Sequence, residues 1–262
     1  MRALPLLALS VLMAPLASCD EEPNLFTIDD DIELGQQLRD EIATSPDEYP
    51  VLSREKYPEA YGHLERIRDL ILQSDDVVYR DQFDWEIRII DDDETLNAFA
   101  APGGYMYVYT GLIRFLDRED DLAGVIGHEI AHADRRHSTQ QLTKQYGLST
   151  LISLILGEDP GLIAEIASGL VGLSFSRSDE SESDTLSVRY LCDGPYAANG
   201  AAEFFRKLEG GGVPEFLSTH PNPDNRVEEI DALAVELGCS TEPYADAKYA
   251  EFIASLPASS GQ

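Results

Sequence analysis

The chain has 262 residues, of which 43% are apolar and 26% charged, so it can bury one sizeable core. Its formal net charge is −30, and it lacks the clusters of Lys and Arg that a phosphate backbone recruits, which argues against nucleic-acid binding. The acidity is typical of a solvated surface or of adaptation to high salt, and no long linker-like stretch divides the chain, so we expect one domain.

The N-terminal stretch MRALPLLALSVLMAPLASC has one basic residue and then an apolar run, which is typical of an export signal over residues 1–18. The run is interrupted by two prolines and is shorter than the roughly 20 residues that a membrane-spanning helix needs. Its end, LASC, resembles the bacterial lipobox, in which the cysteine is acylated and becomes the new N-terminus. We therefore expect a lipid anchor on Cys19 and an acidic tether over residues 19–30. Ordinary cleavage that leaves a cysteine is the alternative.

A lipid anchor predicts a location in the bacterial cell envelope, facing the periplasm. Asp20 behind the cysteine resembles an inner-membrane retention signal of some bacteria, whereas an acidic DEE start marks surface display in others. The sequence does not decide between the inner and the outer membrane.

Two helices are expected after the tether, over residues 34–44 and 57–73, because apolar residues recur there at helical intervals. Three short segments rich in aromatic and β-branched residues follow: FDWEIRII, LNAFA and YMYVYT. The last two are joined by a Pro-Gly-Gly turn. These segments predict a small three-stranded sheet.

From residue 110 onward we expect a mostly helical chain. The segment REDDLAGVIGHEIAHADRRH begins with acidic residues suited to a helix N-terminus. The apolar segment 146–173 is broken by GEDPG into halves too short to cross a bilayer, which predicts a buried or lid-like helical hairpin. The pattern as a whole predicts an α+β fold that is predominantly helical, with a disordered tail over residues 257–262.

Two cysteines remain besides Cys19, namely Cys192 and Cys239. In an exported chain two thiols commonly pair, so we expect a disulfide between them. The alternative is that both are buried small apolar residues, because the count says nothing about their separation.

His128 and His132 are four residues apart on the predicted helix. At about 100° per residue their rings lie about 40° apart and one turn apart, so one metal ion can touch both. Glu129 points off that line but can reach a water on the same ion as a general base. This is the HExxH arrangement of zinc peptidases, although the five-residue pattern also occurs in helices by chance.

His137 lies five residues beyond His132, about 140° around a continuous helix. We therefore expect a structural role for His137, as a cap or a hydrogen-bonding group near the helix C-terminus, and look elsewhere for a third ligand.

The segment SRSDESESD, residues 176–184, resembles the S-R-x-x-E-x-x-x-D segment of the M48 family of zinc metallopeptidases, which includes Ste24-like and Oma1-like proteases. The resemblance implies that Glu180 is the third metal ligand and that Asp184 supports a ligating histidine. Glu182, on another face of the helix, is expected to be solvated.

The resemblance extends over NAFAAPGGYMYVYTGLI and STHPNPDNRVEEI, from about residue 97 to 230. It implies a zincin-like (gluzincin) catalytic domain over residues 31–256, of the soluble periplasmic lipoprotein branch. About 30 residues follow the second segment, too few for the TPR repeats of some relatives. It also implies that His220 lies near the zinc, where it stabilises an oxyanion or blocks the metal, and that Arg226 is its partner.

These features predict a metalloendopeptidase with one Zn²⁺ per chain, acting on extended or unfolded envelope proteins. A substrate strand is expected to pair with the edge of the small sheet, and the neighbouring strand is predicted to be Tyr105, Met106, Tyr107, Val108 and Tyr109. The alternatives are a zinc-binding chaperone or scaffold with a latent site, and a purely structural domain whose histidines are incidental.

Overall fold

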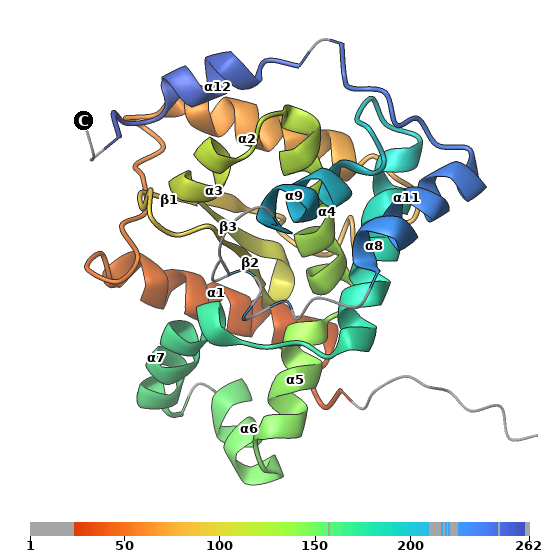
Figure 1. Ribbon diagram of the computed structural model, residues 1–262. Helices are drawn as coiled ribbons and strands as arrows, with labels where there is room; N and C mark the ends of the chain where they lie inside the picture. Colours follow the sequence, from red (N-terminus) through yellow and green to blue (C-terminus); the bar gives the residue numbers. More distant parts are fainter. Residues whose placement is uncertain are drawn as a thin grey trace, which may run out of the picture.

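The computed structural model describes residues 24–156, 158–209, 216, 218, 220, 225–245 and 247–259 (Figure 1). The expected signal segment and Cys19 lie outside these residues, as does the end of the expected C-terminal tail. No helix among the described ranges combines the length and the apolarity needed to span a membrane.

The described part is predominantly helical, with one small sheet. Its first half contains α1 (Ile28–Thr44), α2 (Pro58–Ile71), β1 (Ile87–Ile90), β2 (Ala98–Ala101), the 3-10 turn η1 (Pro102–Gly104), β3 (Tyr105–Tyr109), α3 (Thr110–Phe115) and α4 (Glu119–Asp134). Its second half contains α5 (His137–Gln145), α6 (Leu148–Ile155), α7 (Pro160–Gly169), η2 (Leu170–Gly172), α8 (Arg177–Cys192), α9 (Gly200–Glu209), α11 (Arg226–Leu237) and α12 (Tyr249–Ser255).

The folded domain starts earlier than the expected boundary at residue 31. Thr27 caps α1: its hydroxyl accepts from the Asp30 amide, and the Asp30 carboxylate accepts from the Thr27 amide. Phe26 is buried in the core ahead of the cap. Residues 26–30, assigned to the tether from the sequence, therefore belong to the domain, because a capping box and an apolar anchor order them.

The predicted three-stranded sheet is present, with strand order β1-β3-β2. Strand β1 runs parallel to β3, with Ile87 opposite Met106, and β2 runs antiparallel, with Ala98 opposite Val108. Strand β1 is shorter than the predicted segment 83–90, because Trp85 has a φ of 48° and the extended chain begins only after it.

The prediction that Tyr105 to Tyr109 pair with a substrate is wrong. Strand β3 is the central strand, and its backbone groups are already paired with β1 on one side and β2 on the other. The outer side of β1 is partly covered, since the Leu52 amide donates to the Ile89 carbonyl at 2.8 Å. Strand β2 is thus the sheet edge that faces no further strand among the described residues.

The sheet separates two apolar clusters. Side chains alternate along β3: Met106 and Val108 join a large core with α2, α4, α8 and α9, whereas Tyr105, Tyr107 and Tyr109 join a smaller one with α1, α6 and α7. Figure 1 shows α2 and α4 on one side of the sheet and α1 and α7 on the other. This double burial keeps the sheet and α4 in a fixed relation.

The segment 146–173 forms two separate helices, as its break at GEDPG predicts, but α6 and α7 pack mainly on other helices and not on each other as a hairpin. Leu151 and Leu154 of α6 and Ile163 and Ile166 of α7 are buried in the smaller cluster. Helix α7 packs against α1, and α6 contacts both α1 and α5. Both helices lie at the end of the molecule away from α12 (Figure 1).

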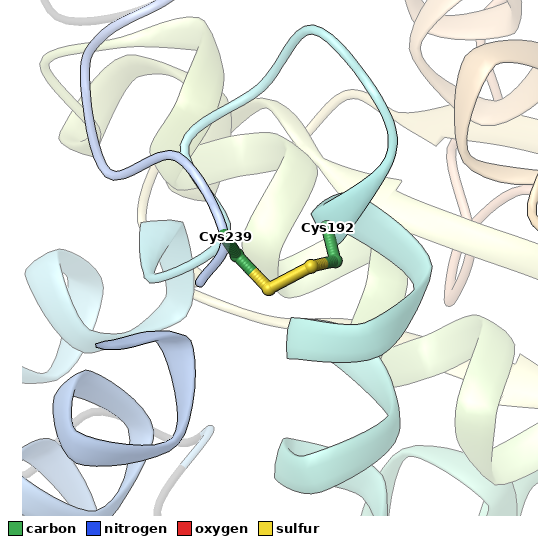
Figure 2. Close-up of a disulfide and its surroundings, with 2 residues drawn as sticks. All are labelled: Cys192 and Cys239. Atoms are coloured by element: carbon green, nitrogen blue, oxygen red, sulfur yellow. A yellow bond between two sulfur atoms is a disulfide. The ribbon is translucent and has the colours of Figure 1, made fainter. Parts of the chain in front are cut away.

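Cys192 and Cys239 form a disulfide (Figure 2), with their Cα atoms 4.8 Å apart. Cys192 is the last residue of α8, and Cys239 follows Gly238, which caps α11 with a φ of 72°. The bond therefore ties the C-terminal ends of α8 and α11 together.

Candidate metal centre

Helix α4 carries the HExxH motif through the middle of the domain, and all of its residues are buried. It crosses α9 at very short range: a Cβ on Gly124 would lie 2.0 Å from the Ala201 amide nitrogen, and one on Gly200 would lie 2.0 Å from the Asp120 carbonyl oxygen. It also contacts α8, where the Ser187 hydroxyl donates to the Gly124 carbonyl at 2.8 Å. These contacts fix the positions of His128 and His132.

Helix α8 brings Glu180 to the same point. Its N-terminus is a capping box, in which the Ser176 hydroxyl accepts from the Asp179 amide and the Asp179 carboxylate accepts from the Ser176 amide. Glu180 follows in the first turn and is fully buried. The local sequence S-R-S-D thus starts the helix at the position that directs the glutamate into the site.

Four buried side chains converge: among the described residues, His128, His132, Glu180 and His220 each offer a donor atom within 4.8 Å of the others. The His128 and His132 Nε2 atoms are 3.0 Å apart, and they lie 3.4 and 3.3 Å from the Glu180 oxygens. Donors bound to one tetrahedral zinc at about 2.0–2.1 Å lie about 3.4 Å apart. The donor set and its spacing therefore fit a zinc ion.

His220 closes the fourth side of this cluster. Its Nδ1 atom is 3.0 Å from a Glu180 oxygen and 3.3 Å from His128 Nε2. The ring stacks on Phe216 at 4.2 Å, and the His220 amide donates to the Phe216 carbonyl. His220 occupies the position that a fourth ligand would take.

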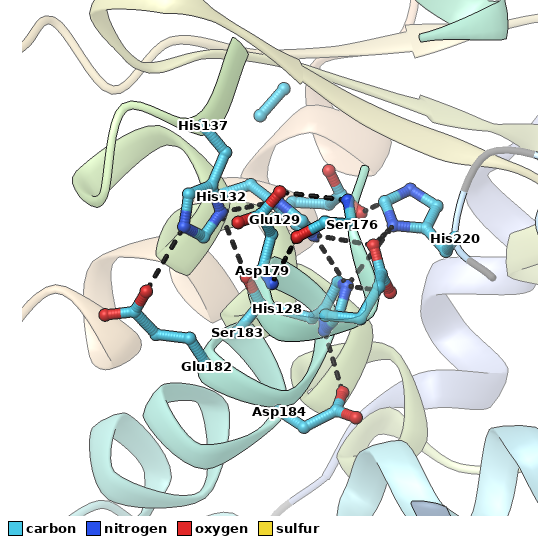
Figure 3. A network of polar contacts seen from close by, with 12 residues as sticks. His128, Glu129, His132, His137, Ser176, Asp179, Glu182, Ser183, Asp184 and His220 are labelled. Carbon is cyan, nitrogen blue, oxygen red and sulfur yellow. Dashed lines mark hydrogen bonds and ion pairs between the residues drawn. The ribbon is translucent and has the colours of Figure 1, made fainter. Parts of the chain in front are cut away.

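Glu129 lies beside the cluster without joining it (Figure 3). One of its carboxylate oxygens, Oε1, is buried without a hydrogen-bond partner among the described residues, and the nearest cation-forming group is His220 Nε2 at 3.5 Å. Burial raises the pKa of the Glu129 carboxyl. A buried acceptor without a partner beside a metal site is suited to accept a proton from a water molecule.

Asp184 and Arg226 support the cluster from behind. Asp184 Oδ1 is 2.9 Å from His128 Nδ1. The buried Arg226 guanidinium donates to both Asp184 oxygens at 2.6 and 2.7 Å and to Glu180 Oε2 at 3.1 Å. One arginine thus contacts the carboxylates of the third donor and of the group that orients the first histidine.

Burial and the neighbouring charges act in opposite directions on the side chains of the cluster. Burial disfavours the charged form of His128, but contacts with Asp184 and Glu180 outweigh it and raise the pKa to about 9. Burial lowers the pKa of His132 well below its usual value. Burial also opposes ionisation of Glu180, yet His220, His128 and His132 lower its pKa, so Glu180 is a carboxylate.

His137 lies against the metal cluster for a reason that the continuous-helix geometry missed. Helix α4 ends at Asp134, Arg136 adopts a left-handed φ of 64°, and α5 starts at His137. The break turns the His137 ring back, so that its Nδ1 atom lies 2.9 Å from Nδ1 of His132. Its Nε2 atom lies 3.4 Å from Glu182 Oε2 (Figure 3).

Glu182 and two aromatic residues complete the surroundings. The Glu182 side chain is half exposed and lies away from the four donors. Phe175 stacks on His132 at 4.1 Å, and Phe216 stacks on His220. No sequence pattern marks Phe175 or Phe216. The dipeptide Arg135-Arg136 likewise gives no sign that Arg136 adopts a positive φ and ends the helix.

Comparison with known proteins matches the part of the chain that contains the four donor residues. The model of the family described as peptidase family M48 matches residues 62–234. The chain is 31% identical over 147 residues to the mitochondrial metalloendopeptidase OMA1 of Arabidopsis thaliana, which covers 54% of this chain and 30% of the relative. It is 30% identical over 155 residues to a putative beta-barrel assembly-enhancing protease of Vibrio cholerae, covering 52% and 32%. For the OMA1 of Saccharomyces cerevisiae the identity is 30%, covering 57% and 47%. The chain thus matches about a third to a half of the length of these relatives.

Proposed function

Since this chain belongs to peptidase family M48, we propose that it is a zinc-dependent endopeptidase whose ion is held by His128, His132 and Glu180. The observation that carries the proposal is the convergence of these donors from α4 and α8 within 4.8 Å, with Glu129 beside them. Metalloendopeptidase is also the name of the OMA1 relatives.

A bound zinc ion would supply Lewis acidity and acidify water. Glu129, with its buried oxygen Oε1, takes the proton of the attacking water and returns it to the leaving amine. The pair Asp184 and Arg226 keeps the His128 ring and the Glu180 carboxylate in place. His220, at 3.5 Å from Glu129, would donate to the developing oxyanion once its ring leaves the fourth position.

An extended polypeptide would pair with the outer edge of β2 in place of β3. The Tyr109 amide donates to the Asn97 carbonyl at 3.1 Å, so Ala98 and Ala100 direct their backbone groups away from β3. Strand β2 packs against α4, so Ala100 is next to the site. A substrate strand would replace the present partners of this edge, because the Ala98 amide donates to Asn97 Oδ1 at 3.0 Å and the Ala100 carbonyl accepts from the Ser138 hydroxyl at 3.3 Å. Main-chain pairing suits unfolded substrates, because it places few demands on their sequence.

A zinc-binding chaperone or scaffold with a latent site is the second candidate. Two observations favour it: all four donor residues are at most 1% exposed, and His220 fills the fourth position. Such a protein would bind zinc fully without cleaving polypeptides.

We further propose that the chain is anchored in a bacterial envelope through an acylated Cys19 and acts there in protein quality control. The lipobox-like LASC and the name of the Vibrio cholerae relative, a putative beta-barrel assembly-enhancing protease, support this location. Replacement Cys19→Ala should release the protein from the membrane fraction, and unchanged retention would remove the anchor.

Digestion of unfolded casein by the zinc-loaded protein tests the peptidase. Wild type and Glu229→Gln, which changes an exposed carboxylate on α11, should digest it at equal rates. Glu129→Gln should lower the rate by roughly 100-fold or more while zinc stays bound, because one proton acceptor contributes about that much. Digestion unaffected by Glu129→Gln would contradict the assigned base, and no digestion by zinc-loaded wild type would favour the scaffold.

A further inference from the structure

Helix α6 presents an apolar face to solvent. Leu148 is 63% exposed, Ile152 47% and Leu156, directly after the helix, 60%. They are spaced four residues apart, so they form one stripe. Leu151 and Leu154, on the other side of α6, are buried. The exposed stripe is therefore not a consequence of a loose helix, since α6 is packed through its opposite face.

The end of the molecule that carries this stripe is poor in charge. Residues 137–173 include one lysine and three acidic residues, so four of 37 are charged, compared with 26% of the whole chain. Helix α6 itself, LSTLISLI, has none. The whole chain has a net charge of −30, so this end differs from the rest of the molecule in its low content of charged residues.

The chain enters the domain at the same end. The Asn24 side chain donates to the Thr139 hydroxyl at 2.9 Å and the Leu25 amide to the Thr143 hydroxyl at 3.2 Å, both on α5. Leu25 is itself 51% exposed. Figure 1 shows α5 leading directly to α6. Thus Leu25 and the α6 stripe account for four of the seven exposed large apolar side chains among the described residues.

The sequence upstream of Asn24 indicates what covers this face. The apolar run that ends at Cys19 lies only five residues before Asn24. Five extended residues span at most about 17 Å. An acyl chain on Cys19, or the apolar run itself, would thus hold the bilayer within reach of the α5–α6 end.

We propose that the apolar face of α6, together with Leu25, docks in the headgroup region of a lipid bilayer beside the N-terminal anchor. A single lipid chain binds a protein to a bilayer only marginally, and a second apolar contact of this kind makes the membrane binding stable. The face contains no basic residue, and the chain is strongly acidic, so docking should need neither anionic lipid nor low salt.

This docking would orient the proposed peptidase, and this consequence rests on the proposed function. Helix α5 starts at His137, in contact with the metal ligand His132, and its nine residues span about 13 Å toward α6. The metal centre would then lie close to the headgroups. Its substrates would be polypeptides that lie at the membrane surface.

Tryptophan quenching tests the docking. The mature chain from Cys19 has one thiol outside the Cys192–Cys239 disulfide, so a maleimide phospholipid can tether it whether or not the cysteine is acylated naturally. The tethered protein is placed on phosphatidylcholine vesicles whose acyl chains are brominated. Leu148→Trp is compared with Val235→Trp, which is 74% exposed on α11, over the common background of the buried Trp85.

We expect the emission of Leu148→Trp to be quenched at least three-fold more than that of Val235→Trp, equally at low and high salt. Adding Ile152→Asp and Leu156→Asp should abolish that difference while the tether holds the protein. Equal quenching at both sites would overturn the proposal. So would lipid-free self-association that Ile152→Asp abolishes, because the face would then cover a second copy. Casein digestion in solution, without vesicles, reports separately on the proposed peptidase.

Discussion

The contact between His132 and His137 joins two ring nitrogens, so one must donate and the other accept. His132 directs Nε2 to the donor cluster. When Nε2 binds a metal, the proton of the neutral ring is on Nδ1. The Nδ1 atom of His137 then accepts at 2.9 Å, and its Nε2–H points to Glu182. His137 thus fixes the tautomer and the orientation of His132.

Replacement of His137 should weaken zinc binding. We expect His137→Leu to lower the zinc affinity by roughly 10- to 100-fold, because such partners contribute about that much. His137→Asn should recover part of the loss, since its amide oxygen can accept from His132. Competition with a chromogenic chelator measures both affinities, and equal values for wild type and His137→Leu would contradict the assigned contact.

Arg226 makes a second residue-scale prediction. Its guanidinium is buried between Asp184 and Glu180 and packs on Phe205 at 3.8 Å. Arg226→Met removes the buried guanidinium that pairs with both carboxylates and should lower the free energy of unfolding by about 3–5 kcal/mol in the absence of zinc. Arg226→Lys should recover only part of it, because lysine lacks the planar fork. Urea unfolding of wild type and the two variants measures these free energies. A lysine variant as stable as wild type would contradict the prediction.

Among elements, the N-terminus of α4 acts as a junction. The buried Glu119 carboxylate accepts from Arg66 of α2 at 2.8 Å, from the Tyr196 hydroxyl at 2.8 Å and from the Lys248 amide at 2.9 Å. Although burial opposes its ionisation, these donors lower the pKa of Glu119. The carboxylate therefore links α4 to α2 and to the start of α12.

The lowered pKa gives the Glu119 contribution a definite pH dependence. It is fully present above the unfolded pKa of about 4.3 and is lost as pH falls through the lower folded pKa. We expect Glu119→Gln to reduce the free energy of unfolding by about 1–3 kcal/mol at pH 7. Denaturation at several pH values should show this difference shrinking below about pH 4; a difference that grows with acid would contradict the assignment.

The disulfide between α8 and α11 should contribute stability without contributing metal ligands. Its cysteines are 47 residues apart, and a loop of that length corresponds to about 4 kcal/mol in the chain-entropy model. The variant Cys192→Ala/Cys239→Ala should lose stability of that order in urea while it keeps its zinc. An unchanged midpoint of urea unfolding would show that the disulfide contributes little to the free energy of unfolding.

Element lengths show what sequence patterns can and cannot predict. The end of α1 at Thr44 and the HExxH helix followed from apolar spacing and the acidic start. The positive φ values of Trp85 and Arg136 did not, because tertiary contacts hold them. Their consequences, a shortened β1 and a turned His137, were therefore missed.

In the whole molecule, strand order and the distant donors set the limit of prediction. Alternation predicts three strands but not that β1 pairs with β3, which is why the edge was assigned to the wrong strand. Spacing predicts that His128 and His132 share an ion. Glu180, His220 and Arg226 come from α8, a later segment and α11, and only a family resemblance indicates them before the fold brings them together.

Zinc removal should destabilise the whole domain, because the cluster joins α4, α8 and the segment at His220. A ligand at about 1,000 times its Kd stabilises by about 4 kcal/mol, which corresponds to roughly 10 °C in Tm for a chain of this size. Thermal unfolding with and without chelator measures the shift. Glu129→Gln should show the same shift, and a Tm insensitive to chelator would contradict a structural link through the ion.

Zinc content provides the most direct comparison, because α8 offers two glutamates two residues apart. Glu180 faces the histidines, whereas Glu182 lies half exposed outside the cluster. Purified in parallel, wild type and Glu182→Gln should each contain one zinc per chain, and Glu180→Gln should contain little. Full zinc in Glu180→Gln would contradict the metal centre on which the proposed hydrolysis depends.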